Sequence, residues 1–137
     1  MPGPLLSMEQ VQAAMKAMME TAMETPNEPV AMAIVDATGN LEAYAKIDNL
    51  RIFSRRHAIR KAYTAAVMGQ DTGAHAQRLQ SQGRSIADMG DPGLTNGQGG
   101  LVIMKDGVIL GGIRVGGYPS GQSDEDLSRV GLEAMNL

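Results

Sequence analysis

The sequence predicts a single α+β domain with an antiparallel sheet. Residues 30–47 and 101–117 each have the pattern of a β-hairpin, and stretches with helical character precede, separate and follow them. Hairpins join antiparallel strands, and helices segregated from strands along the chain are typical of α+β domains. The 137 residues suffice for one hydrophobic core. We therefore expect one domain over residues 1–137, with residues 1–6 flexible.

The first helix is expected over about residues 8–24. Ser7 and Gln10 have the spacing of a capping box, in which each side chain accepts a hydrogen bond from the other residue's backbone N–H. Apolar residues then recur with the helical period until Pro26, which cannot continue the helix.

Each hairpin is predicted from its turn as well as from its strands. Residues 30–36 are an apolar run, residues 41–47 alternate between apolar and polar side chains, and the ATGN segment between them has the composition of a turn. In the second hairpin, Asp106 and Gly107 are the preferred pair for a type I′ turn.

Two further helices are expected, one on each side of the second hairpin. The earlier one begins near Ser54 and continues to Gly69, with a stripe of small residues that permits close packing against a sheet or a partner subunit. The later one is capped by Ser123 and runs to the C-terminus. Between Gly69 and the second hairpin, residues 70–100 are expected to be a long polar loop in which residues 74–80 suit a short helix.

The composition argues against several classes of function. The chain has no cysteine, so a disulfide framework, thiolate ligands and a cysteine nucleophile are excluded. The formal net charge is -3 and few aromatic residues accompany the basic ones, which argues against a nucleic-acid partner. The sequence contains no run of about 18 apolar residues and no signal pattern, so we expect no membrane partner and a cytoplasmic location.

Positive charge is concentrated in one segment. Half of the twelve Lys and Arg residues lie between Lys46 and Lys61, where Asp48 is the only acid. Cations in the first turn of a helix oppose its macrodipole at a cost of roughly 0.3 kcal/mol each, so we expect something to offset the cost. Two explanations remain open: the cations pair with acids elsewhere on the chain or on a partner subunit, or they bind the carboxylate or phosphate of a ligand.

His57 and His75 are the chain's two histidines. Neither lies in a spacing typical of zinc ligands, but a single histidine is sufficient as an axial ligand of heme iron.

Other side chains are candidates for moving a proton. These are Asp36, Asp48, Tyr44 and Lys61 together with His57, although no pair has a spacing that dictates a catalytic geometry. Asp36 also has a simpler interpretation as an ordinary turn residue, because it directly precedes the ATGN segment.

Four segments, in order, resemble the successive blocks of the GlcG/HbpS family, also called heme-binding-protein-like or PduO C-terminal-like domains. They are AIVDATGNLEAYAKIDN, AIRKAYTAA, GGLVIMKDGVILGGIRVGG and SDEDLSRVGLEAM, and the resemblance extends over about residues 8–137. It implies a profilin-like fold, with a five-stranded antiparallel sheet flanked by helices, assembled into symmetric homo-oligomers. Some members are described as binding heme, and others lie beside enzymes that degrade small organic acids or diols.

The resemblance also indicates individual residues. By position in the family's blocks it carries over Asp36, Gly39, Lys61, Ala62, Thr64, Gly116, Gly117 and Asp124. The chain departs from the family at Arg60, where an acid commonly precedes the lysine, which makes the site more cationic. It also departs in MGQDTGAHAQRLQ, where many relatives have a Phe-rich segment.

These observations lead to one main hypothesis, a domain that holds a small anionic ligand, heme or a small organic acid, against the basic helix. Heme is the one cofactor that this hypothesis includes, with His57 or His75 as the residue that meets the iron. The expected ligand-binding residues are Arg56, Arg60, Lys61, Tyr44, Thr64, Asp36, Gly116 and Gly117.

Two alternatives remain open. One is a cofactor-independent lyase, hydratase or isomerase that acts on a small organic acid, with His57 or Asp48 moving the proton. The other is an oligomeric accessory subunit without catalysis, in which the cations meet acids of a neighbouring copy.

Overall fold

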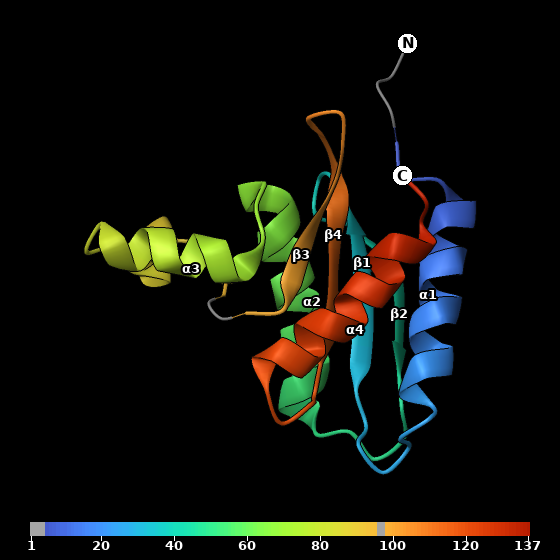
Figure 1. Cartoon of the computed structure of the whole chain (residues 1–137). Coiled ribbons are helices and arrows are strands. Elements are labelled where there is room, and N and C mark those ends of the chain that lie inside the picture. The colour runs from blue at the N-terminus through green and yellow to red at the C-terminus, as the bar shows by residue number, and fades with distance from the viewer. Residues whose placement is uncertain (1–4, 96–97) are drawn as a thin grey trace.

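The computed structural model describes residues 5–95 and 98–137 and has the expected α+β architecture (Figure 1). Within those residues one antiparallel sheet has four strands in the order β2-β1-β4-β3. Their bounds are Ala31–Asp36 for β1, Leu41–Lys46 for β2, Gly100–Lys105 for β3 and Val108–Gly116 for β4. The sheet therefore has one strand fewer than expected. Residues 1–4 of the segment expected to be flexible, residues 1–6, lie outside the described residues.

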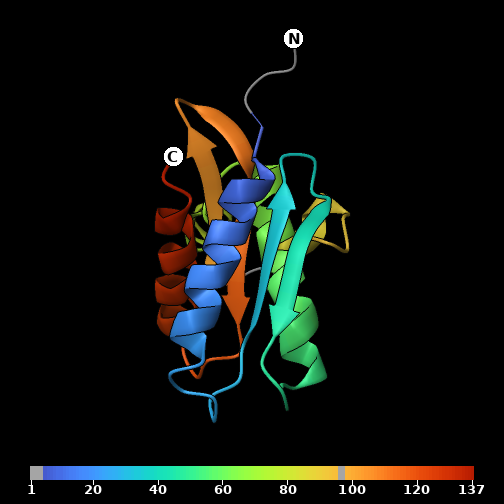
Figure 2. The same ribbon diagram turned by 90° about the vertical axis from the view of Figure 1, so that its right-hand side faces the viewer.

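Helices cover both faces of the sheet. Helix α1, Met8–Ala22, and helix α4, Gly121–Ala134, pack side by side on one face, and helix α2, Ile52–Met68, lies against the other (Figure 2). Alternation along the strands divides the core accordingly: Ile34 and Ile113 belong to the larger cluster under α1 and α4, whereas Ala33 and Val35 belong to the cluster under α2. Among the described residues, no helix is long and apolar enough to cross a membrane.

Local signals determine the first helix and the second hairpin. The Ser7 Oγ accepts from the Gln10 N–H at 3.1 Å while the Gln10 Oε1 accepts from the Ser7 N–H at 2.9 Å, so the predicted capping box is present. Asp106 and Gly107 have φ values of 51° and 78°, as a type I′ turn requires, and they connect β3 to β4. Helix α1 ends at Ala22, slightly before the expected end at about residue 24.

Three boundaries differ from the expectation. Helix α2 begins at Ile52 rather than near Ser54, with Arg51 as a cap residue whose side chain makes no capping hydrogen bond. Helix α4 is capped by Ser120, whose Oγ accepts from the Ser123 N–H at 3.1 Å, so Ser123 lies inside the helix that it was expected to begin. The helix also ends at Ala134, before the C-terminus.

The segment expected to be a long loop contains more regular structure than its composition indicated. Helix α3, Thr72–Ser81, projects from the body of the domain, and a short 3-10 helix follows at Ile86–Met89 (Figure 1). The short helix expected at residues 74–80 lies within α3. Only Thr72, His75 and Leu79 of α3 are buried, which explains why its amphipathic pattern is weak in the sequence.

Glycines bring α2 close to the sheet. A Cβ atom at Gly112 would overlap the carbonyl oxygen of Ala62, and one at Gly116 would lie 3.2 Å from the carbonyl oxygen of Ser54 and 3.5 Å from the Cβ of Ala58. The small residues of α2 therefore pack against glycines of β4. This is the close approach of another backbone that glycine in a strand often indicates.

Candidate functional site

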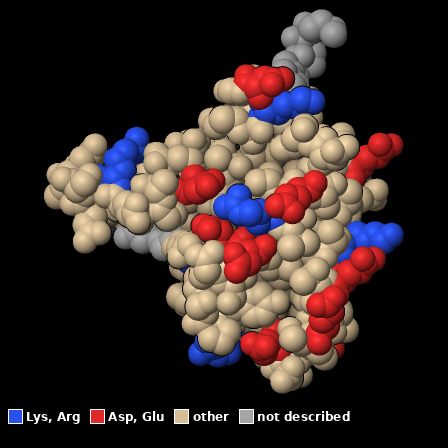
Figure 3. Space-filling model, in the orientation of Figure 1, with Lys and Arg blue, Asp and Glu red and all other residues tan. Residues whose placement is uncertain are grey.

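The basic residues of α2 do not share one environment. Arg51, Arg56 and Arg60 are exposed, whereas the Lys61 side chain is turned inward and is only 6% exposed. The Nε of Arg55 donates to the carbonyl oxygen of Leu50 at 3.0 Å and so caps the preceding loop. Acidic side chains gather over α1 on the face in Figure 3, and α2 lies on the other side of the sheet.

Ion pairs within the chain do not neutralise this cluster. Across residues 5–95 and 98–137 the two ion pairs are Arg114 with Asp124 and Arg129 with Glu125, and neither involves α2. Of the two explanations for the basic cluster, pairing with acids elsewhere on the same chain is therefore not seen in the described residues. Pairing with a ligand or with a neighbouring subunit remains.

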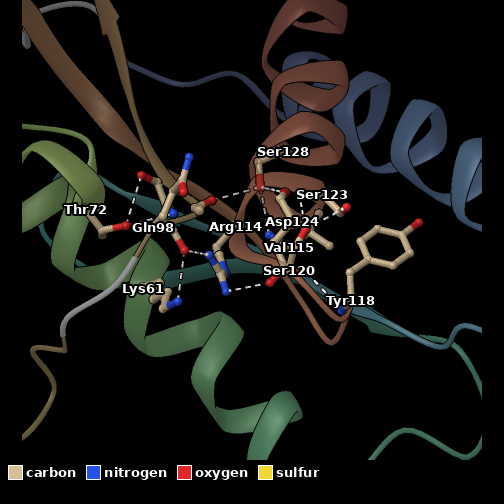
Figure 4. Close-up of polar contacts among 12 residues, drawn as sticks. Lys61, Thr72, Gln98, Arg114, Val115, Tyr118, Ser120, Ser123, Asp124 and Ser128 are labelled. Carbon is tan, nitrogen blue, oxygen red and sulfur yellow. Dashed lines mark hydrogen bonds and ion pairs between the residues drawn. The ribbon is translucent and has the colours of Figure 1, made fainter.

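Lys61 belongs to a buried polar cluster where α2, the start of β3 and the start of α4 meet (Figure 4). Its Nζ donates to the carbonyl oxygen of Gln98 at 2.9 Å, and the Nη1 of Arg114 donates to the same oxygen. Two cationic side chains therefore converge on one neutral backbone acceptor.

Arg114 also pairs with the carboxylate of Asp124. The Nη2 of Arg114 donates to the Oδ2 of Asp124 at 3.0 Å, and the Oδ1 accepts from the Tyr118 N–H at 3.0 Å. Asp124 lies in the first turn of α4, where a carboxylate is also favoured by the helix macrodipole. The Nε of Arg114 has no hydrogen-bond partner among the described residues.

Burial and mutual repulsion shift the titration of this cluster. Burial and the neighbouring Arg114 lower the pKa of Lys61 to about 8, against a smaller opposite effect of Asp124. Burial lowers the pKa of Arg114 to about 10, although Asp124 and Glu125 oppose the shift. Burial raises the pKa of Asp124 despite Arg114, the Tyr118 N–H and Lys61. Two buried cations with one buried carboxylate leave the cluster with excess positive charge.

The sequence interpretation missed Arg114, because GGIRVGG was treated as an apolar strand. In β4, Ile113 and Val115 point into the core under α1 and α4, so Arg114 lies on the α2 face between Gly112 and Gly116. Its cross-strand neighbours are Ala33 and Gly100. A charged residue whose neighbours on the same face are all small is the signal that would have identified it.

His57 lies one turn before Lys61 on α2 and is half-buried. Its ring stacks on Phe53, with centroids 4.9 Å apart and planes inclined by 23°. Burial lowers the pKa of His57 to about 4, with further lowering by the charges of Lys61, Arg114 and Arg60. At neutral pH the imidazole is therefore unprotonated and close to several cations.

His75 lies on the inner side of α3 and is 1% exposed. Neither ring nitrogen has a hydrogen-bond partner in the described part of the chain. Burial and the charge of Arg78 lower its pKa, so the ring is neutral at neutral pH. No group of three or more His, Asp or Glu residues suited to a metal ion occurs among the described residues.

The structure separates Asp48 from His57. Asp48 is exposed and lines a cavity of about 340 Å³ together with Met19 of α1 and Met23, the residue that follows α1, whereas the charges that act on His57 come from α2 and from Arg114. The two residues considered for proton transfer are therefore not brought together. Lys61 is the titratable side chain beside His57.

Tyr44 lies on the sheet face covered by α2, partly buried against the cluster that includes Ala58. Burial raises its pKa, and the charge of Arg55 acts in the opposite direction. Tyr44 is thus close to the start of α2, but on the edge strand β2 rather than in the cluster around Lys61.

Thr64 and Asp36, two further residues of the expected site, form hydrogen bonds with other residues of the chain. The Thr64 Oγ1 donates to the carbonyl oxygen of Arg60 at 2.7 Å and accepts from the Thr95 N–H at 3.0 Å. The Asp36 Oδ1 accepts from Thr38 and Asn40 in the turn of the first hairpin. Burial raises the pKa of Asp36, but these hydrogen bonds together lower it below its ordinary value. Asp36 therefore has the structural role of a turn residue.

Gly116 and Gly117 have a structural role at the end of β4, where other parts of the chain come close to them. Gly116 lies under α2, and Gly117 has φ +130°, with the carbonyl oxygen of Pro29 at 2.6 Å from the position of a Cβ atom. Gly117 requires glycine because of its positive φ and this close contact, whereas a side chain at Gly116 would be tightly packed against α2.

Comparison with known proteins gives a consistent family assignment. Residues 6–133 match the model of the family described as "Haem degrading protein HbpS-like". A crystal structure of a double mutant of Streptomyces reticuli HbpS is 31% identical, with a TM-score of 0.84, and the match covers 97% of this chain and 88% of that one. None of the curated proteins matched the sequence.

Two more distant solved structures share the fold. The PduOC:heme complex is 24% identical, with a TM-score of 0.85, and the match covers 97% of this chain and 96% of that one. The Klebsiella pneumoniae protein ORFY is 21% identical, with a TM-score of 0.84, and the match covers 99% of this chain and 94% of that one.

Proposed function

This chain belongs to the HbpS-like family, and from that premise we propose that it is a small-ligand-binding domain for an anionic ligand. Heme is the first ligand to test, and small organic acids are the second. The proposal is supported by the family's description as haem degrading, by the likeness to HbpS, and by the excess of positive charge around Lys61. The fold shared with the PduOC:heme complex is compatible with it.

The heme proposal depends on one observation, that His57 is a neutral and partly exposed imidazole. Iron is ligated by a neutral imidazole, and the pKa of about 4 keeps His57 neutral at physiological pH. A ring half-buried on Phe53 also offers an aromatic surface beside which a flat macrocycle packs favourably. His57 therefore fits the requirements of an axial ligand, and bound heme would supply the redox-active iron.

The cations around His57 fit the carboxylate groups of the same ligand. Arg60 and Lys61 follow on the same helix, and their charges and that of Arg114 act on His57. Guanidinium and ammonium groups form strong charge-assisted hydrogen bonds with carboxylates. We infer that Arg56 and Arg60, which are exposed, bind propionates at the rim, while Lys61 binds deeper in the site.

His75 is the alternative iron ligand. Its two ring nitrogens have no hydrogen-bond partners in the part of the chain that the structure describes, and ligation would satisfy one of them. The ring is buried beneath α3, so the helix would have to move to admit a macrocycle. The half-exposed His57 needs no such movement, which is why we favour it.

Titration with hemin, followed by the Soret absorbance, tests the proposal. We expect a shifted Soret band in the wild type and in His75→Ala, and loss of that band in His57→Ala. The reverse pattern would assign the iron to His75. If hemin and a panel of small carboxylates all fail to bind the wild type, the ligand-binding function is wrong.

A second candidate function is proton transfer on a small organic acid, and one observation favours it. Lys61, with a pKa of about 8, is partly deprotonated near neutral pH and can act as the base, while the neutral imidazole of His57, one turn away, can donate a hydrogen bond to the substrate. The test is exchange of the α-protons of small carboxylates into deuterated water, followed by NMR. Exchange that is lost in Lys61→Met and in His57→Gln would support it, and no exchange with any acid that binds would refute it.

We also infer that the chain assembles into homo-oligomers. Ile52 and Phe53, at the start of α2, are 64% and 69% exposed and adjacent in sequence, so they offer an apolar surface that a second copy could cover. The exposed acids of α1 and of the residues that follow it, Glu9, Glu20, Glu24 and Glu28, offer opposite charge to Arg51, the exposed cap residue of α2 that the ligand proposal does not use. Analytical ultracentrifugation of the wild type and of Phe53→Ser should give a smaller species for the variant, and a monomeric wild type would contradict the inference.

A further inference from the structure

The backbone carbonyl of Gln98 occupies a position suited to an anion. It accepts hydrogen bonds from both Lys61 and Arg114 at the point where the two cationic groups converge (Figure 4). A carbonyl oxygen carries only a partial negative charge, whereas a carboxylate oxygen in the same position carries a formal charge and is attracted more strongly by the two cationic donors. The two cations therefore have only the partial negative charge of a carbonyl oxygen between them, at a position where the full charge of an anion would be more favourable.

The local backbone is adapted to hold this carbonyl in place. Gly99, the next residue, has φ +122°, and a Cβ atom there would overlap the guanidinium of Arg114. The Gln98 side chain lies between Gly73 of α3 and Gly121 of α4, and its amide donates to Gln122 at 3.0 Å. That last contact is exposed, so little of the free energy of folding depends on it.

A cavity adjoins Gln98. It has a volume of about 400 Å³, lies between α3 and α4, and is lined by residues that include Ala74, Gln77 and Arg129 together with Gln98. Such a volume accommodates a small organic molecule. Glu125 also lines it and acts on the pKa of Arg114, which places the cavity close to the buried guanidinium.

We propose that Gln98 is a plug, and that a small carboxylate enters from this cavity and takes the place of the Gln98 carbonyl oxygen between Lys61 and Arg114. The proposal rests on the proposed function, that the domain binds an anionic ligand, and adds the ligand's class, its entry route and the atoms that bind it. Arg114 becomes the second binding cation, and its Nε, which has no hydrogen-bond partner within residues 5–95 and 98–137 and lies on a side chain that is 2% exposed, is a further donor for the incoming oxygens. Charge balance favours the exchange, because a monocarboxylate neutralises the excess positive charge of the cluster.

Isothermal titration with acetate and with succinate tests the plug. We expect the wild type to bind at least one of them, and Lys61→Met to lower the affinity by about tenfold or more, as the loss of a charge-assisted hydrogen bond implies.

Gln122→Ala, which removes the exposed anchor of the plug, should raise the affinity a few-fold. Ala74→Phe, an exposed residue that lines the cavity, should lower it by obstructing entry. Lys105→Ala, an exposed cation on β3, is the charge-matched control and should bind as the wild type does.

The outcomes separate this inference from the proposed function. If carboxylates bind equally well to Lys61→Met and Ala74→Phe but not to an Arg56→Ala, Arg60→Ala double variant, the ligand lies on the exposed face of α2 and the plug is wrong. If hemin binds but neither acetate nor succinate does, the plug is wrong while the proposed function stands. Should Lys61→Met fail to fold, the opposite effects expected for Gln122→Ala and Ala74→Phe still decide the question.

Discussion

The Nη2 of Arg114, on β4, lies 3.0 Å from the Oδ2 of Asp124, in the first turn of α4, and both side chains are buried. This pair ties the central strand of the sheet to the beginning of the last helix. Removing one partner of a buried ion pair is costly because the other charge remains buried without compensation. We predict that Asp124→Asn lowers the free energy of unfolding by about 3 kcal/mol or more, measured by urea denaturation.

The double variant Arg114→Met, Asp124→Asn provides the control. It leaves no uncompensated partner of the pair, so its loss of stability should be clearly smaller than the sum of the two single losses. A double-mutant cycle with additive effects would mean that the pair contributes no coupling energy.

The cap of α4 gives a second prediction. The Ser120 Oγ accepts from the Ser123 N–H, so Ser120→Ala should cost about 1 kcal/mol of the free energy of unfolding. Ser123→Ala, in contrast, removes only an exposed hydroxyl contact and should cost less than about 0.5 kcal/mol. Urea denaturation of the two variants compares their stabilities directly. A larger loss of stability for Ser123→Ala would mean that Ser123, as the sequence indicated, is the cap residue rather than Ser120.

Contact between α2 and the sheet gives a third prediction. Because a methyl group at Gly112 would overlap the Ala62 carbonyl oxygen, Gly112→Ala should destabilise the domain by about 2 kcal/mol. Gly73→Ala is the matched control: its Cβ atom would make only ordinary contacts, at 3.6 Å and beyond, and alanine favours the helix. The control should change the free energy of unfolding by less than about 1 kcal/mol. Equal losses in the two variants would show that α2 tolerates displacement.

The lowered pKa values of the two histidines should make the free energy of unfolding depend on pH. Burial lowers the pKa of His57 to about 4 and also lowers the pKa of His75 below 6.5, whereas in the unfolded chain both rings titrate near 6.5. The unfolded state therefore binds more protons between those values. The resulting stability is present above about pH 6.5 and is lost as the pH falls toward 4.

Unfolding by urea at pH 7.5, 6 and 4.5 measures this dependence. For His57 alone the loss over that range should be at most about 3 kcal/mol, and His57→Gln should show a shallower decline than the wild type. Identical slopes for the wild type, His57→Gln and His75→Gln would mean that neither ring is held neutral by the fold.

Local sequence signals predicted most of the elements, and long-range contacts explain what they missed. The capping box at Ser7 and the turn at Asp106 depend on residues a few positions apart, so they are visible in the sequence and present in the structure. Helix α3 buries only three side chains, so its weak pattern indicated the short helix at residues 74–80 but not the full extent of α3. The fifth strand came from the family resemblance, and in the described residues there is no such strand.

The candidate site was predicted only in part. The cluster of positive charge is visible in the sequence because its residues are close together along the chain, and the family resemblance indicated Lys61, whose role stays a prediction. What Lys61 contacts does not, since Gln98 lies 37 positions away and Arg114 is on another element. The surroundings of Asp48 have the same origin: it lines a cavity with Met19 of α1, which is distant from it in sequence, whereas His57 lies on α2.

The account depends on an anion that binds beside the Lys61 ammonium group, and the most direct test is the pKa of that ammonium group, measured by NMR on lysine labelled with carbon-13. Without ligand the pKa should be about 8. With saturating succinate, or with gallium protoporphyrin IX as a diamagnetic stand-in for heme, it should rise toward 10.5, because a neighbouring negative charge favours the protonated form. A pKa that stays at about 8 while either ligand is bound would place the anion elsewhere and contradict the account.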